Sequence, residues 1–415
     1  MLAVLFTVAF NAVVGRLLGP EGKGLAALAG MVVAYMGTVG TMGVDYAVIK
    51  TVGEDRNNLR KGMAAVLWTG LAVSVVAVLI MWFFRAYRSY IGLGSLSETM
   101  WALTVAGVPA AIGLKAVQES YRARHDFIGY NLFEAGKGLV GALAAVLLVW
   151  IIPMGNMGAV ATVPIRVIAL LLPGLFLLYR AGLLEFKPDF RLWKKLLAFG
   201  VKSNIGQSLQ FLNYRLDVFI VAYFMGSWGV GIYTAAVGLA EMIWFISGSV
   251  ALVLFPKSAS MSSGQAASFA AKTARITQFF SLILAGLLAA VGWLVIWLIY
   301  GSRFAPAYLP LVLILPGVWL FGYGKLSVSY LMGRDKPLHG TLLTILSLAL
   351  IAPMDLLMIP VWGVSGASVA STVVYGLGGL LGLYWFKKYS GLPVGEFLWI
   401  RKQDIKELVQ AIKRR

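Results

Sequence analysis

Apolar stretches of about 20 residues recur along the whole chain, and short polar segments separate them. An α-helix of this length spans the hydrocarbon core of a bilayer. The pattern predicts twelve membrane-spanning helices and therefore an all-α polytopic membrane protein. The expected spans are 1–16, 25–49, 62–84, 100–121, 128–151, 157–179, 196–224, 230–254, 276–299, 307–331, 338–359 and 364–386.

Glycine patterns recur at corresponding positions in the two halves of the chain. The pattern G-x-x-G-x-G at 19–24 returns at 226–231, displaced by 207 residues. The stretch IPMGNMGAVAT at 152–162 returns as IPVWGVSGASVAS at 359–371, with one residue inserted. We expect each glycine triplet to form a tight turn, because glycine lacks the Cβ that would block unusual backbone angles and close helix approach. A phosphate-binding loop is not expected, since no strand precedes the triplet and no G-K-[ST] follows it.

The repeat predicts two six-helix bundles in the same orientation, a plan of transporters whose substrate site lies between the halves. The expected segments are an N-terminal bundle at 1–180, a cytoplasmic linker at 181–195, a C-terminal bundle at 196–388 and a tail at 389–415. In the tail, Phe397 and four later apolar residues fall near one helical face, and basic residues fill the other. This pattern favours an amphipathic helix on the cytoplasmic membrane surface, and a partner-binding helix is the alternative. The four later residues are Ile405, Leu408, Val409 and Ile412.

Composition limits the chemistry. Hydrophobic residues make up 60% of the chain and the mean hydropathy is +0.84, which is too apolar for a soluble domain. The chain has no cysteine, and its two histidines, His125 and His339, lie far apart in the sequence. We therefore expect no disulfide, no metal site built on Cys or His, and no cofactor.

Basic residues are distributed unevenly between the two sides of the predicted membrane. Of the 35 Lys and Arg residues, 24 lie on the side of the C-terminal tail and five on the other side. Because cytoplasmic loops are enriched in Lys and Arg, both termini are expected in the cytoplasm. Attraction of these loops to anionic lipid accounts for most of the net charge of +18, so no nucleic-acid partner is expected.

Ionisable residues inside the spans are the candidate binding residues, because a charge within a membrane usually faces a cavity or a partner. Two cation–acid pairs are spaced to meet on one helix, which favours a structural role over substrate binding for Lys115 with Glu119 and for Glu134 with Lys137. Arg166 and Lys325 have no acidic residue within one helical turn. They are the better candidates for contact with an anionic ligand.

The predicted helix at 196–224 is unusually polar for a membrane span. Its apolar residues cover an arc of only about 100°, and polar or charged residues occupy the rest. Such a helix is expected either to line water or a polar ligand, or to hydrogen-bond with neighbouring helices. The candidate substrate-binding residues are Lys115, Lys137, Arg166, Asn204, Gln207, Gln210, Arg215 and Lys325, and the candidate acids for ion coupling are Asp217, Glu241 and Asp355.

No catalytic constellation is recognisable. A membrane glycosyltransferase would be expected to carry acidic residues in a sizeable outer loop, whereas the predicted outer loops are short and contain only Glu21 and Glu98. No P-loop for ATP is present in the sequence. The chain is therefore expected to move a solute without covalent chemistry and not to be an enzyme.

Several motifs resemble those of one family. They are GRLLGPEGKGLAALA at 15–29, NYRLDVFIVAYFMGSWGVGIYTAAVGLAEM at 213–242, LFPKSAS at 254–260, IPVWGVSGASVAS at 359–371 and FLWIRKQDIKEL at 397–408. Together they resemble polysaccharide-exporting flippases of the O-antigen (Wzx-like) type, in the multidrug/oligosaccharidyl-lipid/polysaccharide (MOP) exporter superfamily.

The resemblance implies a MATE-like pair of six-helix bundles that form a V in the cytoplasmic membrane of a prokaryote. It implies translocation of an oligosaccharide linked to undecaprenyl pyrophosphate, for surface polysaccharide biosynthesis, by alternating access coupled to H⁺ or Na⁺. The implied partners are this lipid-linked oligosaccharide, membrane lipids and polysaccharide polymerase or assembly proteins. Two alternatives stay open: a cation-coupled multidrug efflux antiporter and a lipid II-type flippase.

Overall fold

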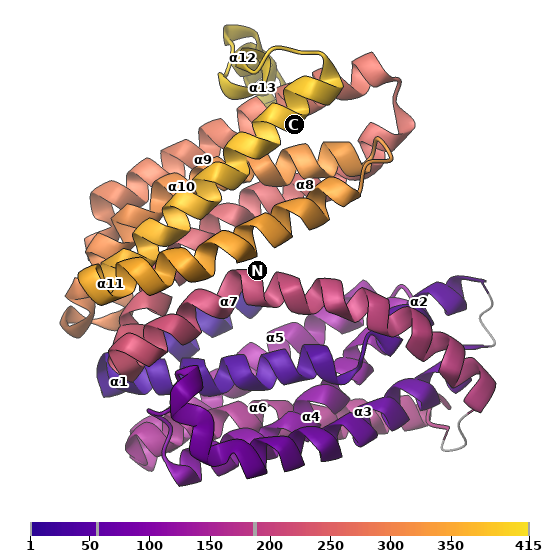
Figure 1. The fold of residues 1–415 in the computed structure, drawn as a ribbon, viewed down its shortest axis with the longest axis vertical. Coiled ribbons are helices and arrows are strands. Elements are labelled where there is room, and N and C mark those ends of the chain that lie inside the picture. Colours follow the sequence, from indigo (N-terminus) through magenta and orange to yellow (C-terminus); the bar gives the residue numbers. More distant parts are fainter. Residues whose placement is uncertain (1, 55–57, 186–188, 414–415) are drawn as a thin grey trace. The chain divides into compact units, whose positions relative to one another are not determined.

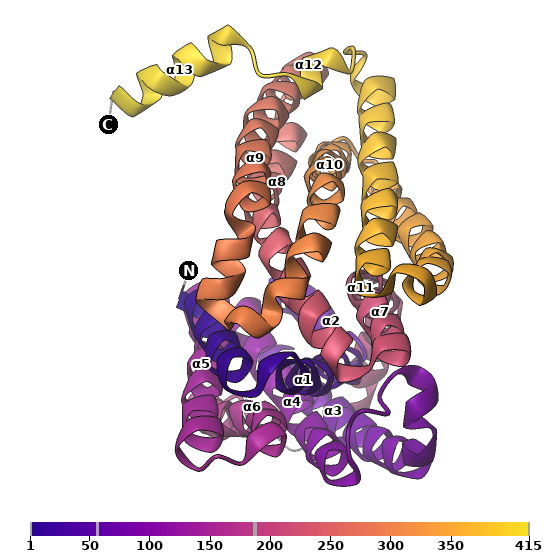
Figure 2. The same cartoon turned by 90° about the vertical axis from the view of Figure 1, so that its left-hand side faces the viewer.

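The computed structural model describes residues 2–54, 58–185 and 189–413, and the regular secondary structure in these residues is helical. The chain forms two compact units. Unit 1 comprises Met1–Ile232 and Leu298–Phe304, and unit 2 comprises Tyr233–Trp297 and Ala305–Arg415. Figures 1 and 2 show the helices from two directions.

Unit 1 is built around α1, which packs against α4, α5 and α6. Helix α4 also packs against α3 and α6, and these three run alongside one another in Figure 1. Small side chains such as Ala26 and Ala145 are buried where α1, α5 and α6 meet. The helices are α1 (Leu2–Gly40), α2 (Val44–Glu54), α3 (Asn58–Phe83), η1 (Phe84–Ile91), α4 (Glu98–Ala123), α5 (Phe127–Ala145), η2 (Val146–Ile151), α6 (Gly155–Arg180) and α7 (Phe190–Ala240), whose residues 233–240 belong to unit 2.

Unit 2 is dominated by the packing of α10 against α11. Glycine permits their close approach: a Cβ on Gly379 of α11 would lie only 2.2 Å from the carbonyl oxygen of Leu320 in α10. The remaining helices of the chain are η3 (Glu241–Ile243), α8 (Trp244–Ser260), α9 (Ser263–Tyr300), η4 (Ser302–Ala307), α10 (Tyr308–Met332), α11 (Leu338–Ser390), α12 (Gly395–Leu398) and α13 (Lys402–Lys413).

Among the described residues, nine continuous helical segments are long and apolar enough to cross a membrane. Three of them contain a glycine that departs from helical backbone angles: Gly19, Gly226 and Gly363. Large apolar side chains on these segments are exposed, for example Leu287, Trp293 and Trp297 on α9. An exposed apolar surface of this kind suits contact with lipid. The number of twelve crossings stays a prediction, since a bent helix can cross the membrane more than once.

The sequence repeat is reproduced in the backbone. Gly19 has φ 71° and ψ −166°, and its counterpart Gly226 has φ 63° and ψ −164°. Likewise Gly155 and Gly363, which correspond in the second repeated motif, have φ 59° and 56°. Residues with a Cβ rarely adopt a positive φ of this size, which explains why glycine stands at both members of each pair. The predicted tight turns are therefore confirmed.

The two repeated turns pack against each other within unit 1. A Cβ on Gly24 would lie 1.8 Å from the carbonyl oxygen of Ser227, and a Cβ on Gly231 would lie 1.9 Å from that of Pro20. Gly24 and Gly231 correspond in the repeat, and so do Pro20 and Ser227. The contact is thus reciprocal, with each turn presenting a glycine to the backbone of the other.

One predicted span is not a single helix. The expected span 25–49 breaks at residues 41–43, where α1 has ended and α2 has not begun. Met42 and Gly43 both have positive φ, 48° and 71°. A Cβ on Gly43 would lie 2.1 Å from the carbonyl oxygen of Gly200, so this elbow packs directly on α7. Its apolar flanks conceal the break in the sequence.

The C-terminal tail is anchored in unit 2, and the prediction that Phe397 lies on the membrane surface is wrong. Phe397 is fully buried and stacks on Phe386, with ring centroids 3.9 Å apart. Arg275 of α9 donates two hydrogen bonds of 2.9 Å to the carboxylate of Asp404, and Lys272 pairs with Glu407. The side chains of Ile405, Leu408, Val409 and Ile412 lie outside the described part of the chain.

Candidate functional site

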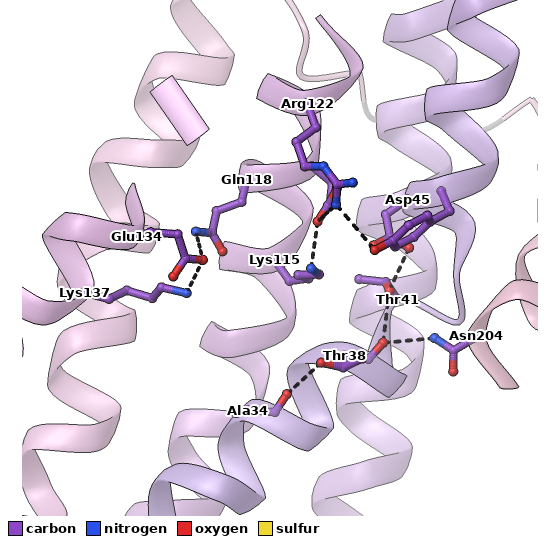
Figure 3. Close-up of polar contacts among 12 residues, drawn as sticks. Ala34, Thr38, Thr41, Asp45, Lys115, Gln118, Arg122, Glu134, Lys137 and Asn204 are labelled. Atoms are coloured by element: carbon purple, nitrogen blue, oxygen red, sulfur yellow. Dashed lines mark hydrogen bonds and ion pairs between the residues drawn. The ribbon is translucent and has the colours of Figure 1, made fainter. Parts of the chain in front are cut away.

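A network of ionisable side chains lies inside unit 1, on α2, α4 and α5 (Figure 3). Its centre is Glu119 of α4, only 2% exposed. Lys115 Nζ lies 2.7 Å from one oxygen of this carboxylate, and Arg122 Nη1 lies 3.0 Å from the other. A buried carboxylate needs such partners, because it has lost the water that would otherwise stabilise its charge. The negative charge of Glu119 is therefore offset by two cations, and the two ion pairs link successive turns of α4.

The second predicted local pair is also present. Lys137 Nζ lies 2.7 Å from Glu134 Oε1 on α5, and Gln118 of α4 donates a hydrogen bond of 2.9 Å to the same oxygen. Both pairs that spacing predicted are thus confirmed. Lys115 and Lys137 each have a carboxylate within reach, which makes them weaker candidates for an anionic ligand than a cation without one.

Arg166 of α6 is a cation without a carboxylate in contact, and Glu134 of α5 interacts with it only electrostatically. Its guanidinium has no hydrogen-bond or salt-bridge partner among the described residues. Its Cζ lies 5.9 Å from the ring centroid of Phe10. A Cβ on Gly30 of α1 would lie 3.1 Å from its Nη2, and one on Gly141 of α5 would lie 3.6 Å from its Cδ. Glycine on both neighbouring helices therefore leaves the room that this side chain occupies.

The polar face of α7 contributes differently at each position. Asn204 is buried, donates a hydrogen bond of 3.0 Å to the carbonyl oxygen of Thr38 and accepts one of 3.2 Å from Ser208. It therefore ties α7 to α1. Gln207 and Gln210 are half-buried on the same helix. Their role in lining a cavity stays a prediction.

Arg215 and Asp217 lie one turn further along α7. Arg215 is half-buried and donates a hydrogen bond of 3.1 Å to the carbonyl oxygen of Tyr214. Asp217 is 3% exposed, and its Oδ1 accepts a hydrogen bond of 2.7 Å from the backbone N–H of Val218. A role for Asp217 in exchanging a proton or a cation stays a prediction.

In unit 2, Lys325 of α10 lies against aromatic rings. Its Nζ is 3.8 Å from the ring centroid of Trp244 and 5.7 Å from that of Phe321, which are cation–π distances. Glu241 is half-buried and interacts electrostatically with Lys325. Asp355 of α11 is fully buried. Roles for these residues in substrate or ion binding stay predictions.

Two features of the structure have little or no signal in the sequence. Asp45 lies in the first turn of α2, directly after the elbow at residues 41–43. Met-Gly before a Val-Asp pair is the only local signal. The docking of Asp404 on Arg275 joins residues 129 positions apart and leaves no local pattern at all.

Helices long enough to cross a membrane and charged side chains held between those helices indicate a polytopic membrane protein. Its fold is similar to that of MOP-superfamily transporters. A multidrug resistance MATE family transporter of that superfamily, in an inward-facing conformation, matches with a TM-score of 0.74 and 16% identity over 94% of each chain. The lipid II flippase MurJ, in an inward closed conformation, matches with a TM-score of 0.79 and 12% identity, over 95% of this chain and 87% of its own. A MOP superfamily transporter from Pyrococcus furiosus matches with a TM-score of 0.65 and 15% identity, over 94% and 92%.

The chain belongs to the polysaccharide biosynthesis protein family, whose sequence profile matches residues 13–309. A search of curated proteins finds no match. At identities of 12–16%, the likeness to the solved structures is one of fold. The family places this fold in polysaccharide biosynthesis, as the motif resemblance had implied.

Proposed function

We propose that the protein translocates a lipid-linked oligosaccharide, carried on undecaprenyl pyrophosphate, across the cytoplasmic membrane of a prokaryote. The family assigns the chain to polysaccharide biosynthesis, and the fold is that of membrane transporters. Transport proceeds by alternating access with both termini in the cytoplasm. A reporter active only in the cytoplasm should therefore be active when fused after Arg415, and a silent fusion would contradict this orientation.

Among the candidate residues, Arg166 gives the strongest support for binding an anionic substrate. A cation within a membrane-spanning helix is costly unless it is paired or meets an anion. Arg166 has no salt-bridge partner among the described residues, while Lys115 and Lys137 in the same unit have one each. A pyrophosphate that leaves water must regain its hydrogen bonds, and a planar guanidinium supplies several at once. Arg166 is therefore the first contact that we assign to the anionic head of the substrate.

The other candidate residues complete the proposal. Lys325 and Arg215 supply further positive charge, and Gln207 and Gln210 supply hydrogen bonds to sugar hydroxyl groups. Asp217, Glu241 and Asp355 are the acids that bind the coupling H⁺ or Na⁺. Polysaccharide polymerase or assembly proteins receive the product.

The test is transport by the purified protein in vesicles, measured as access of an impermeant sugar-modifying enzyme to labelled lipid-linked oligosaccharide. Losing one donor to a charged group costs roughly 1.5–3 kcal/mol, so Arg166→Ala should weaken substrate binding about ten- to a hundredfold. Arg166→Lys should retain part of the activity, because an ammonium keeps the charge and loses the planar fork. Arg180→Ala is the matched control, since Arg180 is an exposed arginine at the end of the same helix.

Two results would contradict the proposal. Wild-type transport by Arg166→Ala at normal expression would remove this residue from the substrate site. Loss of the gene that leaves surface glycans intact, and instead sensitises the cell to cationic dyes, would favour multidrug efflux.

A further inference from the structure

The elbow between α1 and α2 holds a buried acid. Asp45 is 2% exposed and lies two residues after Gly43, the glycine that packs on α7. Its Oδ1 accepts a hydrogen bond of 3.0 Å from Thr41 Oγ1 (Figure 3). Thr41 and Asp45 flank the turn of the chain at Met42 and Gly43, which both have positive φ angles.

Asp45 forms no salt bridge with the described residues. Within the described residues, no Lys or Arg lies within salt-bridge distance of its carboxylate. Glu119 and Lys115 of α4 are the charged groups that interact with it electrostatically. Lys115 is already bonded to Glu119, and so is Arg122, which also reaches the Tyr46 hydroxyl at 3.4 Å.

The start of α2 compensates only part of the charge of Asp45. An acid in the first turn of a helix meets the positive end of the helix dipole, worth about half an elementary charge. Half a positive charge does not offset the cost of burying a full negative charge. A buried carboxylate in this position avoids that cost by binding a proton, which makes it neutral. The contrast with Glu119, which has two cations in contact, is the observation on which the inference depends.

The hydrogen bonds around Thr41 lead from Asp45 to α7. The hydroxyl of Thr41 lies 3.0 Å from Asp45 Oδ1 and 3.4 Å from the carbonyl oxygen of Thr38. The same carbonyl oxygen accepts the hydrogen bond from Asn204 of α7. Since a hydroxyl has one proton, Thr41 donates to Asp45 while that carboxylate is ionised. When Asp45 is protonated, it donates to Thr41, and Thr41 then donates to Thr38.

We propose that Asp45 is a proton-binding site of unit 1 whose occupancy is transmitted to α7 through Thr41, Thr38 and Asn204. One proton from the aqueous phase adds to the carboxylate, and no other bond forms or breaks. The inference deepens the proposed function and rests on it, since ion-coupled transport gives the proton its use. It adds a site in unit 1 to the acids Asp217, Glu241 and Asp355.

Infrared spectroscopy tests the site without any transport. A protonated carboxylic acid has a carbonyl stretching band that a carboxylate lacks. The purified protein, titrated from alkaline to acidic pH, should gain such a band while ordinary exposed aspartates are still ionised. Asp45→Asn should lose this band, and Thr41→Val should shift its frequency. Asp335→Asn, at an exposed position, is the matched control and should keep the band unchanged.

Spectra of Asp45→Asn that match the wild type at every pH would overturn the inference. So would a band that responds to sodium concentration and not to pH, because the site would then hold a metal cation.

Transport in vesicles tests the link to α7. Wild-type transport should vary with pH, and Asp45→Asn should weaken that variation, since the acids Asp217, Glu241 and Asp355 remain. Asn204→Ala should keep the infrared band of Asp45 and weaken the pH response of transport to the same extent. An unchanged pH response in Asp45→Asn would refute the coupling. If the wild type moves no lipid-linked oligosaccharide under any condition, the proposed function fails, while the infrared result still decides whether Asp45 binds a proton.

Discussion

Replacing Gly24 by alanine places a methyl group where the backbone of the second glycine turn lies. The new Cβ would be 1.8 Å from the carbonyl oxygen of Ser227 and 2.9 Å from the backbone nitrogen of Gly231. Because these are backbone atoms, no side-chain rotation can relieve the contact. Reaching even 3.0 Å from the Ser227 oxygen requires the two turns to separate by about 1.2 Å.

The cost follows from two opposing effects. Forcing an extra methyl group into a packed interior costs about 1–3 kcal/mol. Alanine in place of a helical glycine contributes about 0.5–1 kcal/mol of stabilisation, because the unfolded chain loses less freedom on folding. Because the contact is with backbone atoms, the upper part of the first range applies, about 2–3 kcal/mol, and the net destabilisation of Gly24→Ala is about 1–2.5 kcal/mol. Gly231→Ala should cost a similar amount, since its Cβ would lie 1.9 Å from the Pro20 oxygen.

The reciprocal contact gives a sharper prediction for the double variant. One separation of the two turns makes room for both methyl groups, so Gly24→Ala and Gly231→Ala together should destabilise less than the sum of the single changes. Thermal unfolding of purified protein in detergent measures all three. Gly206→Ala is the matched control, since a Cβ there meets nothing within 4 Å, and it should be neutral or stabilising. Single variants as stable as the control, or fully additive losses, would refute the packing that we describe.

Two further predictions concern the anchored tail. Phe397→Ala should lower the stability of unit 2 by about 3–5 kcal/mol, because it leaves a cavity where a buried aromatic ring was. Trp399→Ala, at a position 68% exposed, should change the stability little. Equal thermal unfolding of the two variants would contradict the anchoring. Hydrogen bonds from Arg275 hold the pKa of Asp404 below its ordinary value. The stabilisation by this pair is therefore complete above the ordinary pKa of aspartate and is lost as the pH falls through the lowered folded-state value. A nitroxide spin label on Gln403→Cys, in a chain without other cysteines, reports this loss by electron paramagnetic resonance and should become mobile over that acidic range. Adding Asp404→Asn should make the label mobile at every pH. A label that stays immobile in Asp404→Asn would show that the pair does not hold α13.

The sequence by itself determined what local geometry controls. Apolar length indicated the membrane, because the bilayer sets a minimum helix length. Spacing of three or four residues predicted the pairs of Lys115 with Glu119 and of Glu134 with Lys137, because an α-helix brings such positions together whatever surrounds it. The glycine repeat predicted the turns at Gly19 and Gly226, because a positive φ excludes nearly every other residue.

Only the tertiary structure decided which distant groups meet. Arg166 was a candidate from its lack of a nearby acid, but Gly30 and Gly141, which leave room for it, lie on other helices. The elbow at Gly43 was hidden, since its apolar flanks read as one continuous span. Asn204 bonds to Thr38 across 166 positions, and Arg275 to Asp404 across 129. Such contacts depend on how whole helices pack, and that packing minimises the free energy of many residues at once, so no single stretch of sequence encodes it.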